Sequence, residues 1–132
     1  MPSTPLTPGA YLKMRRCAAG LSVSDVAAKI ATAPRLAEHA RAELIELIEA
    51  DATPASFSTI IVLNNVYHFD LDVLAALQRI NLGADLPSPR LCRICACSDY
   101  DACFSRTVFG PCFWTETDLC SGCTSKPVSA AA

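Results

Sequence analysis

The cysteines between Cys92 and Cys123 carry the clearest chemical signal in this 132-residue chain, because seven of its eight cysteines lie there. This segment begins with a Cys-x2-Cys pair, Cys92 and Cys95, and ends with a second one, Cys120 and Cys123. Two residues between cysteines let both sulfurs reach one ion from a tight turn, and two such pairs complete a tetrahedron of thiolates. We therefore expect Cys92, Cys95, Cys120 and Cys123 to bind a structural Zn2+ ion.

The three cysteines between these pairs leave several alternatives open. Cys97, Cys103 and Cys112 could bind a second metal ion whose fourth ligand is a shared outer thiolate or a carboxylate. The candidate carboxylates are those of Asp99, Asp101 and Asp118. The three thiols could instead be unligated, two of them could form a redox-labile disulfide, or the segment could hold an iron–sulfur cluster. Ligands could also be mixed between two sites, so the sequence predicts one or two Zn2+ ions.

The cysteine segment is too short to fold around an apolar core of its own, so metal binding would supply its folding free energy. The apolar side chains expected to pack around the site are Ile94, Phe104, Phe109, Phe113, Trp114 and Leu119. A closed, all-thiolate site offers no position for a reactive water. The chain also lacks a Ser-His-Asp set and an H-E-x-x-H motif, so we predict that it is not an enzyme.

The first two thirds of the chain predict helices. Thr7 and Pro8 suit a helix start and Gly20 a helix end, while Ser22 and Asp25 suit a capping box. Asp70 is expected to cap the last of the helices. The expected helices cover about residues 8–19, 23–30, 34–51, 57–67 and 71–80, with Val26, Ala27 and Ile30 sharing one face of the second. The lone Cys17 on the first helix is expected to be a small core residue. The stretch 81–90 is predicted to be a linker and 125–132 a disordered tail.

Basic residues gather near the N-terminus although the net charge of the chain is -2. Residues 10–41 contain six basic and two acidic side chains, and the rest of the chain is acidic. Short helices joined by a turn could place this basic surface on DNA. The predicted contacts to bases or phosphates are Arg35, His39 and Arg41, with Lys13, Arg15 and Arg16 holding phosphates.

Two stretches resemble known families. "TPGAYLKMRRCAAGLSVSDVAAKI", with Ala19-Gly20-Leu21 before Ser22, and "FSTIIVLNNVYHFDLDVLAAL" together resemble Xre/lambda-repressor-like domains over residues 7–80. This resemblance implies a helix-turn-helix fold and DNA binding. The turn "ATAP" and the helix that becomes acidic by Glu43 depart from the recognition helix of that family. "CRICACSDYDAC", "GPCFW" and "DLCSGC" resemble a cysteine-rich tail of phage and prophage proteins, which implies such an origin and metal binding.

The sequence thus predicts a mainly α protein: a compact five-helix helix-turn-helix domain (7–80), a linker (81–90) and a small zinc-ribbon or knuckle-like module (91–124). The expected function is that of a small DNA-binding transcriptional regulator of bacterial or phage origin. The alternative is an adaptor or inhibitor that binds a host protein, for example of the transcription machinery. The zinc module could also form a homodimer. No secretion signal or apolar run of about 18 residues is apparent, so we expect a cytoplasmic protein without a membrane partner.

Overall fold

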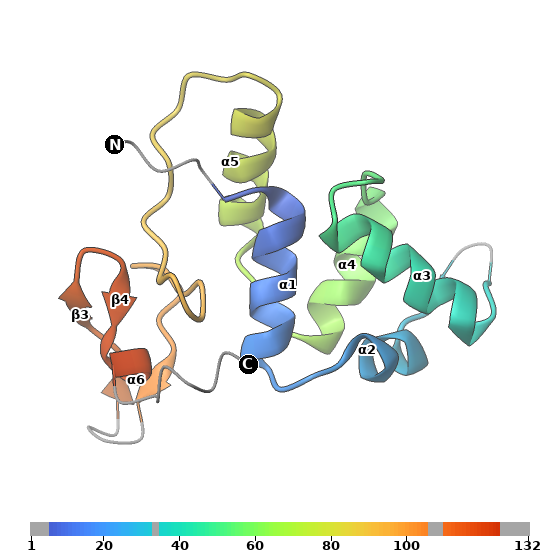
Figure 1. The fold of residues 1–132 in the computed structure, drawn as a ribbon, viewed down its shortest axis with the longest axis horizontal. Coiled ribbons are helices and arrows are strands. Elements are labelled where there is room, and N and C mark those ends of the chain that lie inside the picture. The colour runs from blue at the N-terminus through green and yellow to red at the C-terminus, as the bar shows by residue number, and fades with distance from the viewer. Residues whose placement is uncertain (1–5, 33–34, 106–109, 125–132) are drawn as a thin grey trace. The chain divides into compact units, whose positions relative to one another are not determined.

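The computed structural model describes residues 6–32, 35–105 and 110–124, with the side chains of residues 104 and 105 outside this description (Figure 1). The chain divides into two compact units, Met1–Ser88 and Pro89–Ala132, and the boundary falls within the stretch 81–90 that the sequence predicts to be a linker. The predicted tail, 125–132, lies outside the described residues. No helix in the described ranges is long and apolar enough to cross a membrane.

The described part of the first unit contains helices only, in agreement with the mainly α prediction. They are α1 (Pro8–Ala18), α2 (Val23–Lys29), α3 (Glu38–Glu49), α4 (Phe57–Val66) and α5 (Leu71–Asn81). Side-chain oxygens of Thr7, Ser22, Ser56 and Asp70 accept hydrogen bonds from backbone N–H groups in the first turns of α1, α2, α4 and α5. The predicted caps at Thr7 and Asp70 and the predicted Ser22–Asp25 capping box are therefore confirmed.

The third helix begins later than the sequence predicts. Pro34 lies outside the described residues, and α3 starts at Glu38. Before it, the Leu36 N–H donates to the Thr32 hydroxyl (2.8 Å), and the Arg41 guanidinium donates to the carbonyls of Ala27 and Leu36 (2.7 and 3.0 Å). These bonds stabilise residues 35–37, which are not helical, ahead of α3.

An apolar core stabilises the first unit. Its buried apolar side chains are Tyr11, Leu12, Val26, Ala27, Ile30, Ile45, Ile48, Leu63, Tyr67, Phe69, Val73, Leu74 and Leu77. The predicted face of the second helix is confirmed. Full burial of each large apolar side chain contributes about 1.5–3 kcal/mol. Cys17 is exposed, so its assignment to the core was wrong.

The second unit has very little regular structure. Its described elements are β1 (Phe104–Ser105), β2 (Gly110–Pro111), β3 (Trp114–Glu116), β4 (Leu119–Cys120) and α6 (Ser121–Thr124). β1 pairs with β2 and β3 with β4, both antiparallel, and the second pair has an irregular register between Trp114 and Glu116. Isolated two-stranded ribbons of this length are not stable in water by themselves, so side-chain interactions must hold the unit together.

Candidate metal centre

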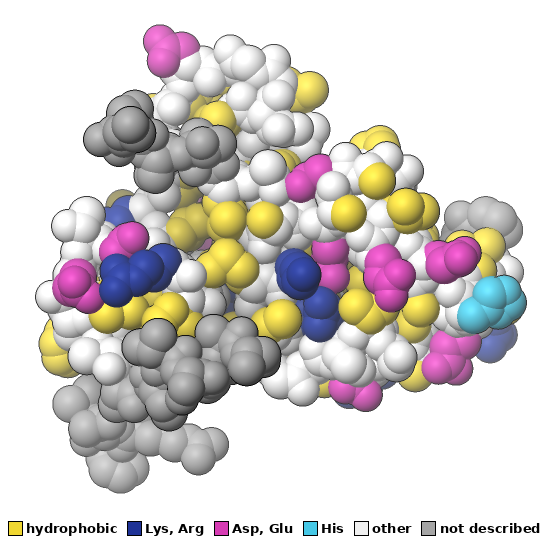
Figure 2. All heavy atoms as spheres, viewed as in Figure 1, with side chains coloured by type: hydrophobic (Ala, Val, Ile, Leu, Met, Phe, Trp, Pro, Cys, Tyr) yellow, Lys and Arg dark blue, Asp and Glu magenta, His cyan; other side chains and the backbone are white. Residues whose placement is uncertain are grey.

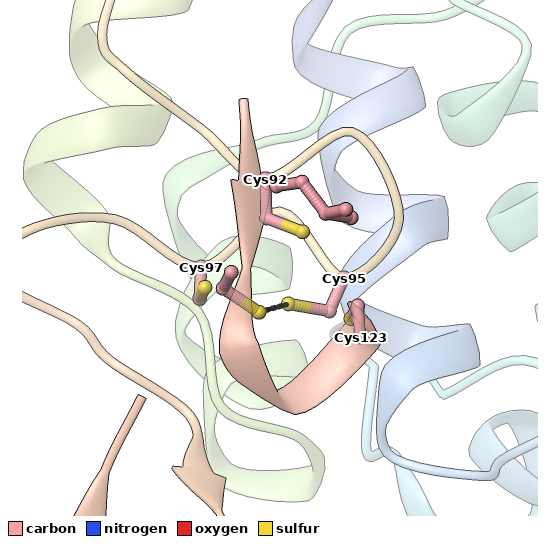
Figure 3. Close-up of a cluster of buried hydrophobic side chains, with 6 residues drawn as sticks. Cys92, Cys95, Cys97 and Cys123 are labelled. Atoms are coloured by element: carbon pink, nitrogen blue, oxygen red, sulfur yellow. Dashed lines mark hydrogen bonds between the residues drawn. The ribbon is translucent and has the colours of Figure 1, made fainter. Parts of the chain in front are cut away.

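The centre of the second unit is a cluster of sulfur atoms. Cys92, Cys95, Cys97, Cys120 and Cys123 are buried together with Leu119, and Cys103, Cys112 and Trp114 pack against them half-buried. None of these seven cysteines forms a disulfide. Figure 3 shows the sulfurs of the labelled cysteines converging, with a dashed line for the contact between Cys95 and Cys120.

The distances between sulfurs suit metal ligands. The Sγ atoms of Cys95 and Cys120, of Cys97 and Cys112, and of Cys103 and Cys120 are each 3.7 Å apart. A tetrahedron with Zn–S bonds of about 2.3 Å has edges of about 3.8 Å. A disulfide requires about 2.05 Å. In a four-iron cluster each cysteine binds a different iron, which spreads the sulfurs farther apart. Each observed separation therefore matches that of two thiolates bound to the same tetrahedral ion.

Two sets of four cysteines could each hold an ion. We call Cys92, Cys95, Cys97 and Cys120 the buried group, since all four are buried. We call Cys97, Cys103, Cys112 and Cys120 the half-buried group, since two of its members are partly accessible. Within each group all four sulfurs lie within 4.8 Å of one another. Cys97 and Cys120 belong to both groups.

The expected four-cysteine set and the observed groups overlap without being identical. Cys92, Cys95 and Cys120 lie in the buried group, but Cys97 is its fourth member. Cys123 is buried in the same cluster and interacts with Cys95 and Cys120, yet it belongs to neither group. The spacing of the two Cys-x2-Cys pairs pointed to Cys123 as the fourth ligand and gave no sign that Cys97 takes this place in the buried group.

The expected second set does come together. Cys97, Cys103 and Cys112 join the half-buried group, and a shared outer thiolate, that of Cys120, is its fourth member. No carboxylate of the described residues belongs to either group. Asp118 instead pairs with Arg93, and Asp99 accepts a hydrogen bond from the Trp114 indole.

A tight turn positions the first three cysteines. The Ala96 N–H donates to the Cys92 carbonyl (2.8 Å), and the Cys92 N–H donates to the Cys97 carbonyl (3.0 Å). Ala96 has a φ of 60°, in the left-handed region that non-glycine residues seldom adopt. The chain therefore reverses within six residues and brings all three sulfurs to one side.

Two further backbone features bring in the later cysteines. The Cys112 N–H donates to the Cys103 carbonyl (2.8 Å) beside the β1–β2 pair. Gly122, between Cys120 and Cys123, approaches the Cys103 sulfur so closely that an added Cβ would lie 2.8 Å from it. A side chain at position 122 would push this sulfur out of place.

Two arginines join the first turn to the β3–β4 hairpin. The Arg90 guanidinium lies 4.2 Å from the centroid of the Trp114 ring and donates to the Thr117 carbonyl (2.7 Å). Arg93 pairs with Glu116 and Asp118, and these hydrogen bonds raise the pKa of Arg93. Such contacts can orient the hairpin, but exposed ion pairs add little stability.

The electrostatics of the sulfur cluster limit how many of its thiols can ionise together. Hydrogen bonding with Cys97, against the effect of burial, lowers the pKa of the Cys95 thiol to about 4. The hydrogen bond with Cys95 and burial raise the pKa of Cys97, and burial raises the pKa values of Cys103 and Cys123. Adjacent buried thiols cannot all ionise without a positive charge among them. A bound metal ion would supply that charge.

The apolar surroundings of the cluster are thinner than the sequence predicts. Leu119 is buried and Trp114 packs on the sulfurs. Ile94 and Phe113 are 46% and 56% exposed, so for these two the prediction of packing was wrong. Phe109 and the Phe104 side chain lie outside the described residues.

Three of the six residues predicted to contact DNA are bonded within the first unit. Arg16 is buried and pairs through two nitrogens with Glu49 (2.6 and 3.0 Å), while it also donates to the Leu21 carbonyl. Buried Arg15 donates to the His68 carbonyl, and Arg41 stabilises the connection before α3. The sequence predicted that these three guanidiniums contact DNA. In the structure they bond to other residues of the first unit.

The other three predicted residues are exposed. They are Lys13 on α1, Arg35 just before α3 and His39 in its first turn. Acidic side chains gather over α3 on the face that Figure 2 shows, and Glu43 and Glu46 are exposed.

Comparisons of this chain with protein-family models, curated proteins and solved structures found no match.

Proposed function

We propose that the sulfur cluster is a structural zinc centre that folds the second unit. The observation that supports this most directly is the 3.7 Å separation of three sulfur pairs, the spacing of a zinc–thiolate tetrahedron. Soft thiolates without nitrogen or carboxylate ligands favour zinc over magnesium, calcium or manganese. A site closed by four thiolates leaves no room for a reactive water, so the proposed role is to bind and fold rather than to catalyse.

X-ray absorption at the zinc edge of the purified full-length protein tests this identity. We expect zinc with a shell of sulfur atoms only, at about 2.3 Å. Nitrogen or oxygen atoms in that shell, or iron in place of zinc, would contradict the proposal. Cys17→Ser is the matched control, because Cys17 is the one cysteine on the first unit and is exposed. This substitution should leave the spectrum unchanged.

For the first unit we propose DNA binding, and for the whole chain the role of a small transcriptional regulator. The support is the order of the helices, with α2 packed against α3, together with the exposed side chains of Arg35 and His39 at one end of this pair and of Lys13 on α1. Arg15, Arg16 and Arg41 would act indirectly, by holding the helices that present these side chains. The zinc module would mediate dimerisation or dock a partner.

Gel-shift measurements with phage and host promoter fragments over a salt series test this role. We expect affinity to fall steeply as salt rises, because phosphate contacts release counterions. Arg35→Ala should lower the log–log slope by about one. Arg79→Ala, which removes an exposed arginine from α5, is the control and should change little. Undetectable or salt-independent binding would refute the proposal.

A second candidate function is binding of a host protein. It is favoured by the exposed acids Glu43 and Glu46 on α3, which would repel phosphates, and by Phe57, which is 78% exposed at the start of α4. Pull-down from nuclease-treated host lysate should then recover one stoichiometric partner. Phe57→Ser should abolish recovery, whereas Leu82→Ser, at a position 76% exposed, should not. Equal recovery by both variants would argue against this candidate.

A further inference from the structure

We propose that the centre is binuclear, with the thiolates of Cys97 and Cys120 each bridging two Zn2+ ions. This inference rests on the proposed zinc centre and adds to it the number of ions and the ligands of each. One ion would bind the buried group and the other the half-buried group. Cys92 and Cys95 are then terminal ligands of the first ion, and Cys103 and Cys112 are terminal ligands of the second.

The overlap of the two groups carries the proposal. Two groups of four sulfurs that have two members in common contain six sulfurs, which is the arrangement of two tetrahedra sharing one edge. Cys97 and Cys120 form that edge. The 3.7 Å separations fall in both halves: the pair Cys95–Cys120 belongs to the buried group, and the pairs Cys97–Cys112 and Cys103–Cys120 belong to the half-buried group.

The burial of the two shared cysteines fits a bridging role. Cys97 and Cys120 are each only 1% exposed, and they come from separate parts of the chain: the first turn and strand β4. A bridging sulfur must face an ion on either side, which requires such a central position. One ion in the buried group would leave the sulfurs of Cys103 and Cys112 without a cation. Two ions give each of the six sulfurs at least one metal bond.

Cys123 is left as a seventh thiol beside the centre. It interacts with Cys95 and Cys120 but lies in neither group of sulfurs. In the binuclear arrangement both ions have four ligands without it. The proposal therefore predicts that Cys123→Ser retains both ions, whereas a centre built on the two Cys-x2-Cys pairs would lose one.

Native mass spectrometry of the full-length protein refolded with excess Zn2+ counts the ions. We expect two per chain. One ion per chain would refute the binuclear arrangement and leave the zinc centre standing, and none would refute both. Cys112→Ser should reduce the count to one, because it removes a terminal ligand of the half-buried group only. Cys17→Ser should keep two ions.

Nuclear magnetic resonance of the unsubstituted chain loaded with 113Cd identifies the bridges without any variant. We expect two cadmium signals. The β-protons of Cys97 and Cys120 should correlate with both signals, and those of the four terminal ligands with one signal each. The β-protons of Cys123 should correlate with neither. Correlation of every cysteine with a single cadmium, or a correlation from Cys123, would overturn the proposal.

Discussion

The interior of the first unit differs in kind from the interior of the second. The first unit buries large apolar side chains from five helices, such as Tyr11, Leu63 and Leu77. In the described part of the second unit, most of the buried apolar side chains are those of cysteines, and its strands are two or three residues long. The hydrophobic effect can stabilise the first arrangement alone, whereas in the proposed zinc centre the second would gain its main free energy when thiolates bind metal.

Removal of the metal is therefore expected to have the largest effect, because it should unfold the second unit and leave the first unit folded. After chelation of the full-length protein, we expect the amide signals of residues 89–124 to collapse toward unfolded positions. The signals of residues 8–81 should keep their dispersion. Two-dimensional 1H–15N spectra recorded before and after chelation, with metal content checked by mass, measure this. Dispersed signals for 89–124 in protein free of metal would show that the second unit folds without it.

The substitution Arg16→Met is expected to destabilise the first unit and to leave the second unit unaffected. This substitution leaves the carboxylate of Glu49, whose side chain is 6% exposed, without its Arg16 partner inside the first unit. Breaking one side of a buried ion pair costs about 3–5 kcal/mol of unfolding free energy. Thermal or urea unfolding of the helical signal measures this loss, and the metal content should not change.

The double variant Arg16→Met with Glu49→Leu provides the control for that loss. It replaces both charges by apolar groups and should recover much of the stability. If the double variant is as unstable as the single one, the loss arises from packing of the Arg16 stem rather than from the unpaired carboxylate.

Local signals explain how much of the fold the sequence could predict. Thr7, Ser22 and Asp70 satisfy backbone groups within a few residues, so their capping roles can be read from neighbouring residues. The start of α3 could not be read in this way. It depends on Arg41 reaching back to the Ala27 carbonyl, a contact 14 residues away in the sequence.

The same distinction applies to the candidate sites. Spacing in the sequence located the sulfur cluster, because each Cys-x2-Cys pair is a local feature. The grouping of Cys97 with Cys92 and Cys95, and the sharing of Cys120, depend on how three segments fold together. Net charge likewise could not separate exposed Lys13 from buried Arg16, since burial is a tertiary property.

A smaller effect is expected for Gly122→Ala in the second unit. The added Cβ would lie 2.8 Å from the Cys103 sulfur, which would have to move away from the half-buried group. Overpacking of this kind costs about 1–3 kcal/mol, so we expect roughly tenfold weaker binding of one ion. Competition with a chromophoric chelator measures the affinity, and an unchanged affinity would mean that the sulfur relaxes freely.

Gly9→Ala is the counterpart in the first unit. Its added Cβ would collide with the carbonyl oxygens of Ile48 and Glu49 at the end of α3. It should lower the stability of the helices and leave metal affinity unchanged. The two glycine substitutions together test whether each unit responds only to its own packing.

The smallest expected effect is that of Ser22→Ala at the start of α2. The Ser22 hydroxyl accepts a hydrogen bond from the Asp25 N–H (3.0 Å), and loss of a helix cap costs about 1 kcal/mol. Thermal unfolding of the helical signal measures it, with Ser24→Ala in the same helix as the control. A loss as large for Ser24→Ala would assign the effect to helix surface changes in general.

The pH dependence separates the two halves of this capping box. The Ser22 N–H donates to the Asp25 carboxylate (2.9 Å), which holds the pKa of Asp25 below its ordinary value. The contribution of the carboxylate is therefore fully present above about pH 4 and is lost as the pH falls through the lowered pKa. The hydroxyl does not titrate, so the penalty of Ser22→Ala should persist in acid, while the penalty of Asp25→Ala should vanish there. Equal acid sensitivity of both variants would mean that the hydroxyl bond forms only when the carboxylate is ionised, and that the box acts as a single unit.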